Sequence, residues 1–209
     1  MSGGGAAARR ERGRQEMRAA ILEAARRIVD AEGLGALSMR AIARDLDYSP
    51  AALYEYFAAK EEIARALYFE GAGGLKDRMQ EALAAIPAGT PAVEAVRALG
   101  RTYRAYALDE PELFRLIFAS ELAGSTSDHE EPHDPRGGFD VLVEAMARAI
   151  AAGEMEPGPP ELFALTAWSS VHGFVMLELG AFLPGQPGPA RDALYDAHLQ
   201  RILTGMLRR

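Results

Sequence analysis

The stretch LSMRAIARDLDYSPAALYEYFAAK, residues 37–60, decides the fold. Its first half predicts a short helix, because Ser38 stands where a side-chain oxygen can accept a hydrogen bond from a backbone N–H of the first turn. Leu37 before this cap and Ile42 after it have the spacing of a hydrophobic staple. The apolar residues of this segment share one helical face: Met39, Ile42, Ala43 and Leu46.

The second half repeats the same signals. Ser49 is a second cap, and Pro50 follows at the first helical position, where a missing N–H costs nothing. Tyr48 and Leu53 have the spacing of a second staple. Because only residues 46–48 separate the two segments, we predict a helix-turn-helix.

The composition favours helices and excludes thiol chemistry. Hydrophobic residues make up 49% of the 209 residues, enough for a sizeable core, and many are the strong helix formers Ala and Leu. The chain has no cysteine, which excludes disulfides and thiolate metal or redox sites. It has neither an uninterrupted apolar run of membrane-spanning length nor a signal-peptide core at the N-terminus. We therefore expect a soluble, cytoplasmic protein without a membrane partner.

The formal net charge of −7 is unevenly distributed. Residues 1–70 carry eleven basic and eleven acidic side chains, whereas residues 71–209 carry twelve and nineteen. A basic arm precedes the helix-turn-helix, with arginines at Arg9, Arg10, Arg12, Arg14 and Arg18. The acidity therefore lies away from the N-terminal segment, although a neutral segment predicts only modest non-specific affinity for DNA.

Periodicity along the chain predicts an all-α fold with no strand. Residues 1–13 lack a periodic apolar face and are expected to be disordered. A helix over 60–86 is interrupted by Gly71, Gly73 and Gly74, which predict a kink or a break. The other expected helices are 14–32, the two of the helix-turn-helix, 93–108, a short one from Pro111, 139–152, 161–182 and 190–207, with a polar loop over 124–138.

The helix-turn-helix, the motif LYEYFAAKEEI that leads into a long helix, and the helical remainder together resemble the TetR family of transcriptional regulators. The spacings match over residues 14–65. Beyond them the resemblance rests on helix order and on Trp168, His172 and Gly173, which look like the W-x3-HG signature of one subgroup. The family usually has Gly in the turn, where this chain has Asp47, a residue that tolerates the left-handed conformation better than most.

The resemblance implies a homodimer in which a ligand changes the spacing of two DNA-reading heads. It implies a basic arm over 1–13, a three-helix DNA-binding domain over 14–60, and a C-terminal ligand-binding and dimerisation domain over 61–209. The last two helices would form the dimer, and repression would be the commoner outcome. No cofactor is implied.

The resemblance also places nine residues on double-stranded operator DNA: Ser38, Arg40, Ser49, Pro50, Ala51, Ala52, Tyr54, Tyr56 and Lys60. Arg40 would bind guanine or a phosphate, the segment 49–52 would lie against base edges, and the last three residues would hold phosphates. Each has an alternative: the tyrosines can belong to the core, Lys60 can neutralise nearby glutamates, and Arg40 can lie on a solvated face. The arm arginines add phosphate or minor-groove contacts, or form a plain tail.

Apolar and aromatic residues of the C-terminal part are the candidates for lining a pocket for a small hydrophobic ligand: Met79, Leu83, Tyr103, Tyr106, Phe114, Ile117, Phe118, Trp168, His172 and Met176. Stripes of this kind also form plain core. His172 would hydrogen-bond either a ligand or a buried partner.

Other functional classes find little support. In DHEEPHD, residues 128–134, His129 and His133 have metal-ligand spacing, but Pro132 prevents the helix that would align them. The sequence contains no nucleophile elbow and no P-loop, and FEGAGG at 69–74 follows a helix rather than a strand, so we do not expect an enzyme. A helical small-molecule-binding or scaffold protein without sequence-specific DNA binding is the remaining alternative.

Overall fold

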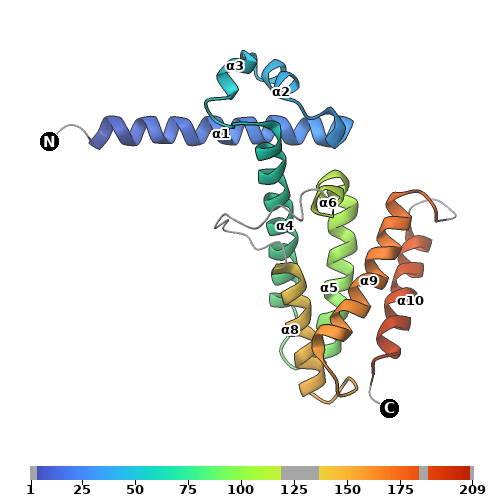
Figure 1. Cartoon of the computed structure of the whole chain (residues 1–209). Coiled ribbons are helices and arrows are strands. Elements are labelled where there is room, and N and C mark those ends of the chain that lie inside the picture. Colours follow the sequence, from blue (N-terminus) through green and yellow to red (C-terminus); the bar gives the residue numbers. More distant parts are fainter. Residues whose placement is uncertain (1–3, 119–136, 184–187, 208–209) are drawn as a thin grey trace. The chain divides into compact units, whose positions relative to one another are not determined.

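The structure, a computed structural model, describes residues 4–118, 137–183 and 188–207 (Figure 1). These residues form nine α-helices and one 3-10 helix, which confirms the all-α class. An isolated bridge between Met155 and Leu207 is the one β-type pairing among them. The helices are α1 (Gly4–Glu32), α2 (Met39–Asp45), α3 (Pro50–Leu53), α4 (Lys60–Ala84), α5 (Ala92–Asp109), α6 (Pro111–Ile117), α8 (Gly137–Ala151), α9 (Pro160–Leu179) and α10 (Pro189–Thr204), with η1 (Leu34–Ala36).

The described residues divide into two compact units. The first holds 4–71 and 112–118, and the second holds 72–111, 137–183 and 188–207. Helix α4 supplies residues to both units, whereas α6 belongs to the first although it follows α5 of the second in the chain.

The core of the first unit joins the helix-turn-helix to its neighbours. Ile42 of α2 and Leu53 of α3 are fully buried, and they pack with residues of α1 and of the start of α4. Leu113 and Leu116 of α6 belong to the same cluster. Burial of each such side chain contributes roughly 1.5–3 kcal/mol, so α2 and α3 are stable through this shared core rather than through their own length.

Helix α1 begins well before the expected start at Arg14. The structure continues it back to Gly4, over the arm that the sequence predicts to be disordered. Seven of the ten residues 4–13 are alanine, arginine or glutamate, which have high helix propensity, so the helix continues without an apolar face despite three glycines.

Helix α4 runs without interruption through the glycines at which a kink or break is expected. Gly71 and Gly73 are buried, and a Cβ on Gly74 would lie 3.5 Å from the Tyr106 hydroxyl. Each glycine costs a helix only about 1 kcal/mol, which packing outweighs. The glycines therefore do not end the helix here, and the 3.5 Å at Gly74 is an ordinary van der Waals distance.

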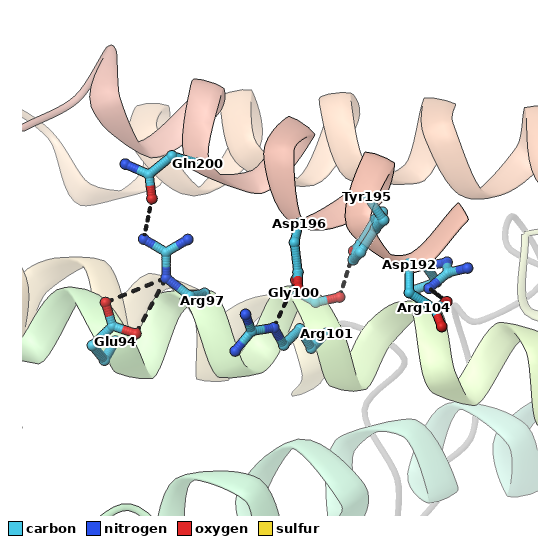
Figure 2. A network of polar contacts seen from close by, with 9 residues as sticks. All are labelled: Glu94, Arg97, Gly100, Arg101, Arg104, Asp192, Tyr195, Asp196 and Gln200. Atoms are coloured by element: carbon cyan, nitrogen blue, oxygen red, sulfur yellow. Dashed lines mark hydrogen bonds and ion pairs between the residues drawn. The ribbon is translucent and has the colours of Figure 1, made fainter. Parts of the chain in front are cut away.

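In the second unit, α5 packs against α8, α9 and α10. A row of arginines on α5 connects it to α10, as Figure 2 shows: Arg97 donates to Gln200 (2.6 Å), Arg101 to Asp196 (2.8 Å) and Arg104 to Asp192 (2.9 Å). Gly100 lies between them, where a Cβ would lie 2.7 Å from Leu199. Helices α5 and α10 are therefore joined by polar contacts on either side of the point where Gly100 and Leu199 approach closely.

Candidate functional site

The helix-turn-helix has the capped geometry that its sequence predicts. Ser38 Oγ accepts a hydrogen bond from the Ala41 N–H (3.1 Å), and Ser49 Oγ accepts one from the Ala52 N–H (3.3 Å). Asp47 adopts the left-handed conformation with φ of 57°. Both serine caps and the tolerance of Asp47 for this turn are confirmed.

The start of α3 is open to solvent. Ser49, Pro50 and Ala51 are exposed, and Ala52 is half-buried, whereas Leu53 at the end of the helix is fully buried. Arg40 on α2 is exposed as well, and Ser38 is half-buried. The core thus holds α3 by one side and leaves its N-terminal residues available to a partner. We call the surface formed by residues 38–60 the reading head.

The three predicted phosphate ligands differ in their surroundings. Tyr54 is 54% exposed, which rules out the alternative that it is a core residue. Tyr56 is partly buried and packs against the core of the first unit. Lys60 is exposed at the first position of α4, where Glu62 accepts a hydrogen bond from the Ala58 N–H (2.8 Å).

Tyr48 differs from its expected role. As half of a second staple it should be covered by Leu53, but it is 48% exposed. It lies directly before the cap of α3 and offers an aromatic ring and a hydroxyl beside that helix. The sequence analysis assigned Tyr48 only to the staple; its position next to the capping serine is the signal that points to an exposed aromatic here.

Arg18 is the one arginine of the arm that the fold itself uses. Its guanidinium lies 3.9 Å from the centre of the Phe57 ring, donates to the Tyr56 carbonyl, and pairs with Glu62 at 3.6 Å. Arg18 therefore connects α1 to the junction of α3 and α4. The other arginines, Arg9, Arg10, Arg12 and Arg14, are exposed.

The second unit contains a chain of polar groups among the predicted ligand-lining residues. Trp168 Nε1 donates to the Tyr103 hydroxyl (3.1 Å), and that hydroxyl lies 2.8 Å from His172 Nδ1. Burial raises the pKa of Tyr103 and lowers the pKa of His172 below its ordinary value, so both groups are neutral at pH 7. In the tautomer with its proton on Nε2, the neutral imidazole accepts a hydrogen bond from the Tyr103 hydroxyl at Nδ1.

The remaining predicted ligand-lining residues are dispersed. Met79 and Tyr106 are buried in the second unit, where Leu83 is half-buried. Met176 is 39% exposed on α9. Phe114, Ile117 and Phe118 belong to the first unit, where the two phenylalanine rings lie 4.9 Å apart. Phe139 of α8, which the sequence did not single out, packs on Trp168 with ring centres 5.6 Å apart.

Helix α9 is apolar on all sides, and its buried side consists of small residues. Ala164, Ala167, Val171 and Val175 face inward, and the opposite side is exposed. The large apolar residues left exposed here are Leu162 (58%), Leu165 (50%), Met176 (39%) and Leu177 (48%) on α9, and Leu194 (48%) on α10. Gly173 lies on the same side of α9, and a Cβ there would meet nothing within 4 Å. We call this set of residues the α9–α10 apolar face.

By length and composition, α9 is also the one described helix that could cross a membrane. The predicted metal-spaced pair, His129 and His133, lies outside the described residues. Within the described ranges, no cluster of three or more histidine and acidic side chains could hold a metal ion.

Comparison with known proteins agrees with this geometry. Residues 21–67 match the family model described as "Bacterial regulatory proteins, tetR family", and residues 96–202 match "Tetracyclin repressor-like, C-terminal domain". The capped turn, the exposed start of α3 and these matches define a helix-turn-helix DNA-binding transcriptional regulator, a class without enzymatic activity. The chain belongs to the TetR family.

Curated relatives fall in the same class. HTH-type transcriptional regulator Rv0681 of Mycobacterium tuberculosis is 27% identical over 192 residues, which cover 92% of this chain and 82% of the relative. HTH-type transcriptional regulator Rv1816 of the same organism is 30% identical over 145 residues, covering 69% of this chain and 60% of the relative.

Solved structures share the fold. A TetR family regulator from Marinobacter aquaeolei has a TM-score of 0.65 at 22% identity, covering 96% of this chain and 100% of its own. PfmR from Thermus thermophilus has a TM-score of 0.63 at 22% identity, covering 90% of this chain and 99% of its own.

Proposed function

We propose that the protein is a ligand-responsive repressor that binds palindromic operator DNA as a homodimer and is released by a small hydrophobic ligand. The observation that carries this proposal is the reading head: α3 is anchored by a buried Leu53 and exposes its first residues. Such a helix enters a major groove, and a two-fold dimer places two of them about 34–36 Å apart.

The exposed residues of the reading head divide into two roles. Ser49, Pro50 and Ala51 lie against base edges, where the proline and alanine offer apolar contact with thymine methyl groups. Ala52, which is half-buried, adds to the same contact with the bases. The second role belongs to the residues that bind phosphate or a guanine edge: Ser38, Arg40, Tyr54, Tyr56 and Lys60. The Ser38 hydroxyl accepts from Ala41 and still has its own proton to donate to a phosphate oxygen.

The α9–α10 apolar face supports dimerisation through the last two helices. Four leucines and a methionine exposed on two adjacent helices make a large apolar surface, and surfaces of this kind mark interaction sites. The open space around Gly173 lets a partner helix approach closely. A second copy of this face would cover the apolar side of α9, so we expect a cytoplasmic dimer rather than a membrane span.

Ligand binding is proposed for the second unit around Tyr103, Trp168 and His172. These three side chains combine apolar walls with a hydrogen-bonded polar chain, which suits a hydrophobic molecule that has one or two polar atoms. Met79, Leu83 and Tyr106, which belong to the same unit and are buried or half-buried, are further candidates for the apolar lining. We place Met176 on the dimer surface instead, because of its exposure.

The experiment is selection of duplexes from randomised double-stranded DNA by the purified protein, followed by sequencing. We expect a palindrome whose half-sites lie about one helical turn apart. Ala51→Glu, which puts a carboxylate on the exposed start of α3, should abolish the enrichment. Ala19→Glu, at an exposed position of α1, is the matched control and should keep it. Enrichment of no sequence by the wild-type protein at low salt would contradict the proposal.

A further inference from the structure

The N-terminal part of α1 forms an exposed helix with arginines on two different sides. Every side chain from Ala7 to Glu16 is exposed, and this segment extends beyond the helix-turn-helix in Figure 1. A helical segment of this length without packing is marginal in water. A partner that binds the segment would supply the stability that the core does not.

The direction of each arginine follows from helical geometry. Arg10, Arg14 and Arg18 are spaced i, i+4 and i+8, so they form one row along α1. Arg9 and Arg12 lie roughly 140° and 160° around the axis from Arg14, at about 100° per residue. The arm therefore has an Arg10–Arg14 side and an opposite side.

Arg18 fixes where the row leads. It packs on Phe57 and pairs with Glu62, so this side of α1 faces the junction of α3 and α4, which also holds Lys60. Arg14 and Arg10 continue the row outward by about 6 and 12 Å along the axis. They place two exposed cations in line with this junction, beyond the part of α1 that the core covers.

Acidic side chains of the arm leave this row uninterrupted. Glu16 lies on the side of Arg12, and Glu11 accepts a hydrogen bond from Gln15 (3.1 Å) on the flank. In a chain of net charge −7, a local row of cations counters the repulsion between protein and DNA. Each DNA strand carries one phosphate charge per roughly 3.4 Å of the helix axis. A row of arginines can therefore pair with successive phosphates, whereas a single anionic group would pair with only one arginine of the row.

We propose that Arg10 and Arg14 form a helical phosphate clamp that binds duplex DNA next to the site read by α3. This inference rests on the proposed function, because it needs a reading head that is seated on DNA. It assigns the arm a fixed binding side, in contrast to a flexible basic tail, for which the positions of the arginines would not matter.

The test compares two variants with the same change in charge. Arg10→Gln/Arg14→Gln removes the row, and Arg9→Gln/Arg12→Gln removes two arginines from the other side. Glutamine keeps the helix propensity. Affinity for the duplex selected above is measured by fluorescence anisotropy over a series of salt concentrations, and circular dichroism checks the fold of each variant.

We expect Arg10→Gln/Arg14→Gln to weaken binding about tenfold or more and to flatten the salt slope by about three to four units for a dimer, at about 0.9 for each lost phosphate contact. Arg9→Gln/Arg12→Gln should stay near the wild type. An equal loss of DNA affinity in both variants would show a general effect of charge and would overturn the clamp. Unchanged affinity in both variants would overturn it as well. If the wild-type protein itself binds no selected duplex, the proposed function fails instead.

Discussion

A few side chains set the geometry of the reading head. Asp47 adopts a left-handed conformation that costs most residues roughly 1–2 kcal/mol, and the two serine caps each contribute about 1 kcal/mol. These residues were predictable from the sequence, because caps and turns depend on local chemistry. The burial of Arg18 against Phe57 was not, since it depends on how α1 crosses the start of α4.

Lys60 has an energetically unusual position. A cation at the first residue of a helix is repelled by the positive end of the helix dipole. Lys60 therefore lowers the stability of α4 slightly unless an anionic group binds it. We expect Lys60→Ala to weaken binding to all DNA sequences alike and to flatten the salt slope by about one unit per half-site. Anisotropy titrations at several salt concentrations measure both effects. An unchanged slope would remove Lys60 from the contacts with DNA.

His172 makes the stability of the fold depend on pH. Burial holds the pKa of His172 below its value of about 6.5 in the unfolded chain, so the unfolded chain takes up the proton first. The stabilising contribution is present above pH 6.5 or so and is lost as the pH falls toward the pKa of the folded state. Thermal melts of the wild type should therefore show falling midpoints between about pH 7 and pH 5.

His172→Gln is the variant that isolates this effect. Glutamine does not titrate, so the midpoint should vary less with pH over the same range. Equal pH dependence of the two proteins would assign the effect to other groups.

At the scale of elements, an ionic cluster connects α5, α9 and α10. Arg104 donates to both carboxylate oxygens of Glu178 (2.7 and 2.8 Å) and to Asp192, and Arg191 lies 3.7 Å from Glu178. The Glu178 side chain is only 5% exposed. The cluster therefore determines which helices pack together, because any other arrangement leaves a buried carboxylate unpaired.

Arg104→Ala should lower the free energy of unfolding by about 3 kcal/mol, since one partner of a buried pair is lost while Arg191 remains. Arg101→Ala is the control: its pair with Asp196 is about half exposed, and we expect a loss of about 0–1 kcal/mol. Chemical denaturation measures both values. Similar losses in the free energy of unfolding of the two variants would show that burial does not make the Arg104 pair more important for stability than the exposed pair.

At the scale of the whole molecule, the order and the type of the helices were predictable because apolar periodicity and proline positions are local signals. Three features were not predictable, because they depend on tertiary packing. Helix α1 continues through an arm that lacks an apolar face. Helix α4 continues through glycines that are buried or lie beside Tyr106, and α6 joins the first unit through Leu113 and Leu116. The local geometry followed the same division: the caps at Ser38 and Ser49 were predictable, whereas the exposure of Tyr48 and the packing of Phe139 on Trp168 were not.

A substitution at Gly173 tests whether the α9–α10 apolar face forms the dimer contact. Because nothing in the chain lies near its Cβ direction, Gly173→Arg should leave the monomer folded. In a dimer built on the α9–α10 apolar face it places a charge in the contact, and we expect dissociation to monomers in sedimentation velocity runs. Ala105→Arg, at an exposed position of α5, is the control and should stay dimeric. A Gly173→Arg protein that remains dimeric would place the dimer contact elsewhere.

The only tryptophan of the chain, Trp168, lies in the second unit, between the Phe139 ring and the Tyr103 hydroxyl. Its fluorescence therefore reports on one place alone. A ligand that enters beside Tyr103 and His172 changes the polarity around the indole and shifts the tryptophan emission. DNA would bind the reading head of the first unit, which contains no tryptophan. The protein thus has a built-in optical probe that separates effector binding from operator binding, and no dye is needed to screen for the ligand.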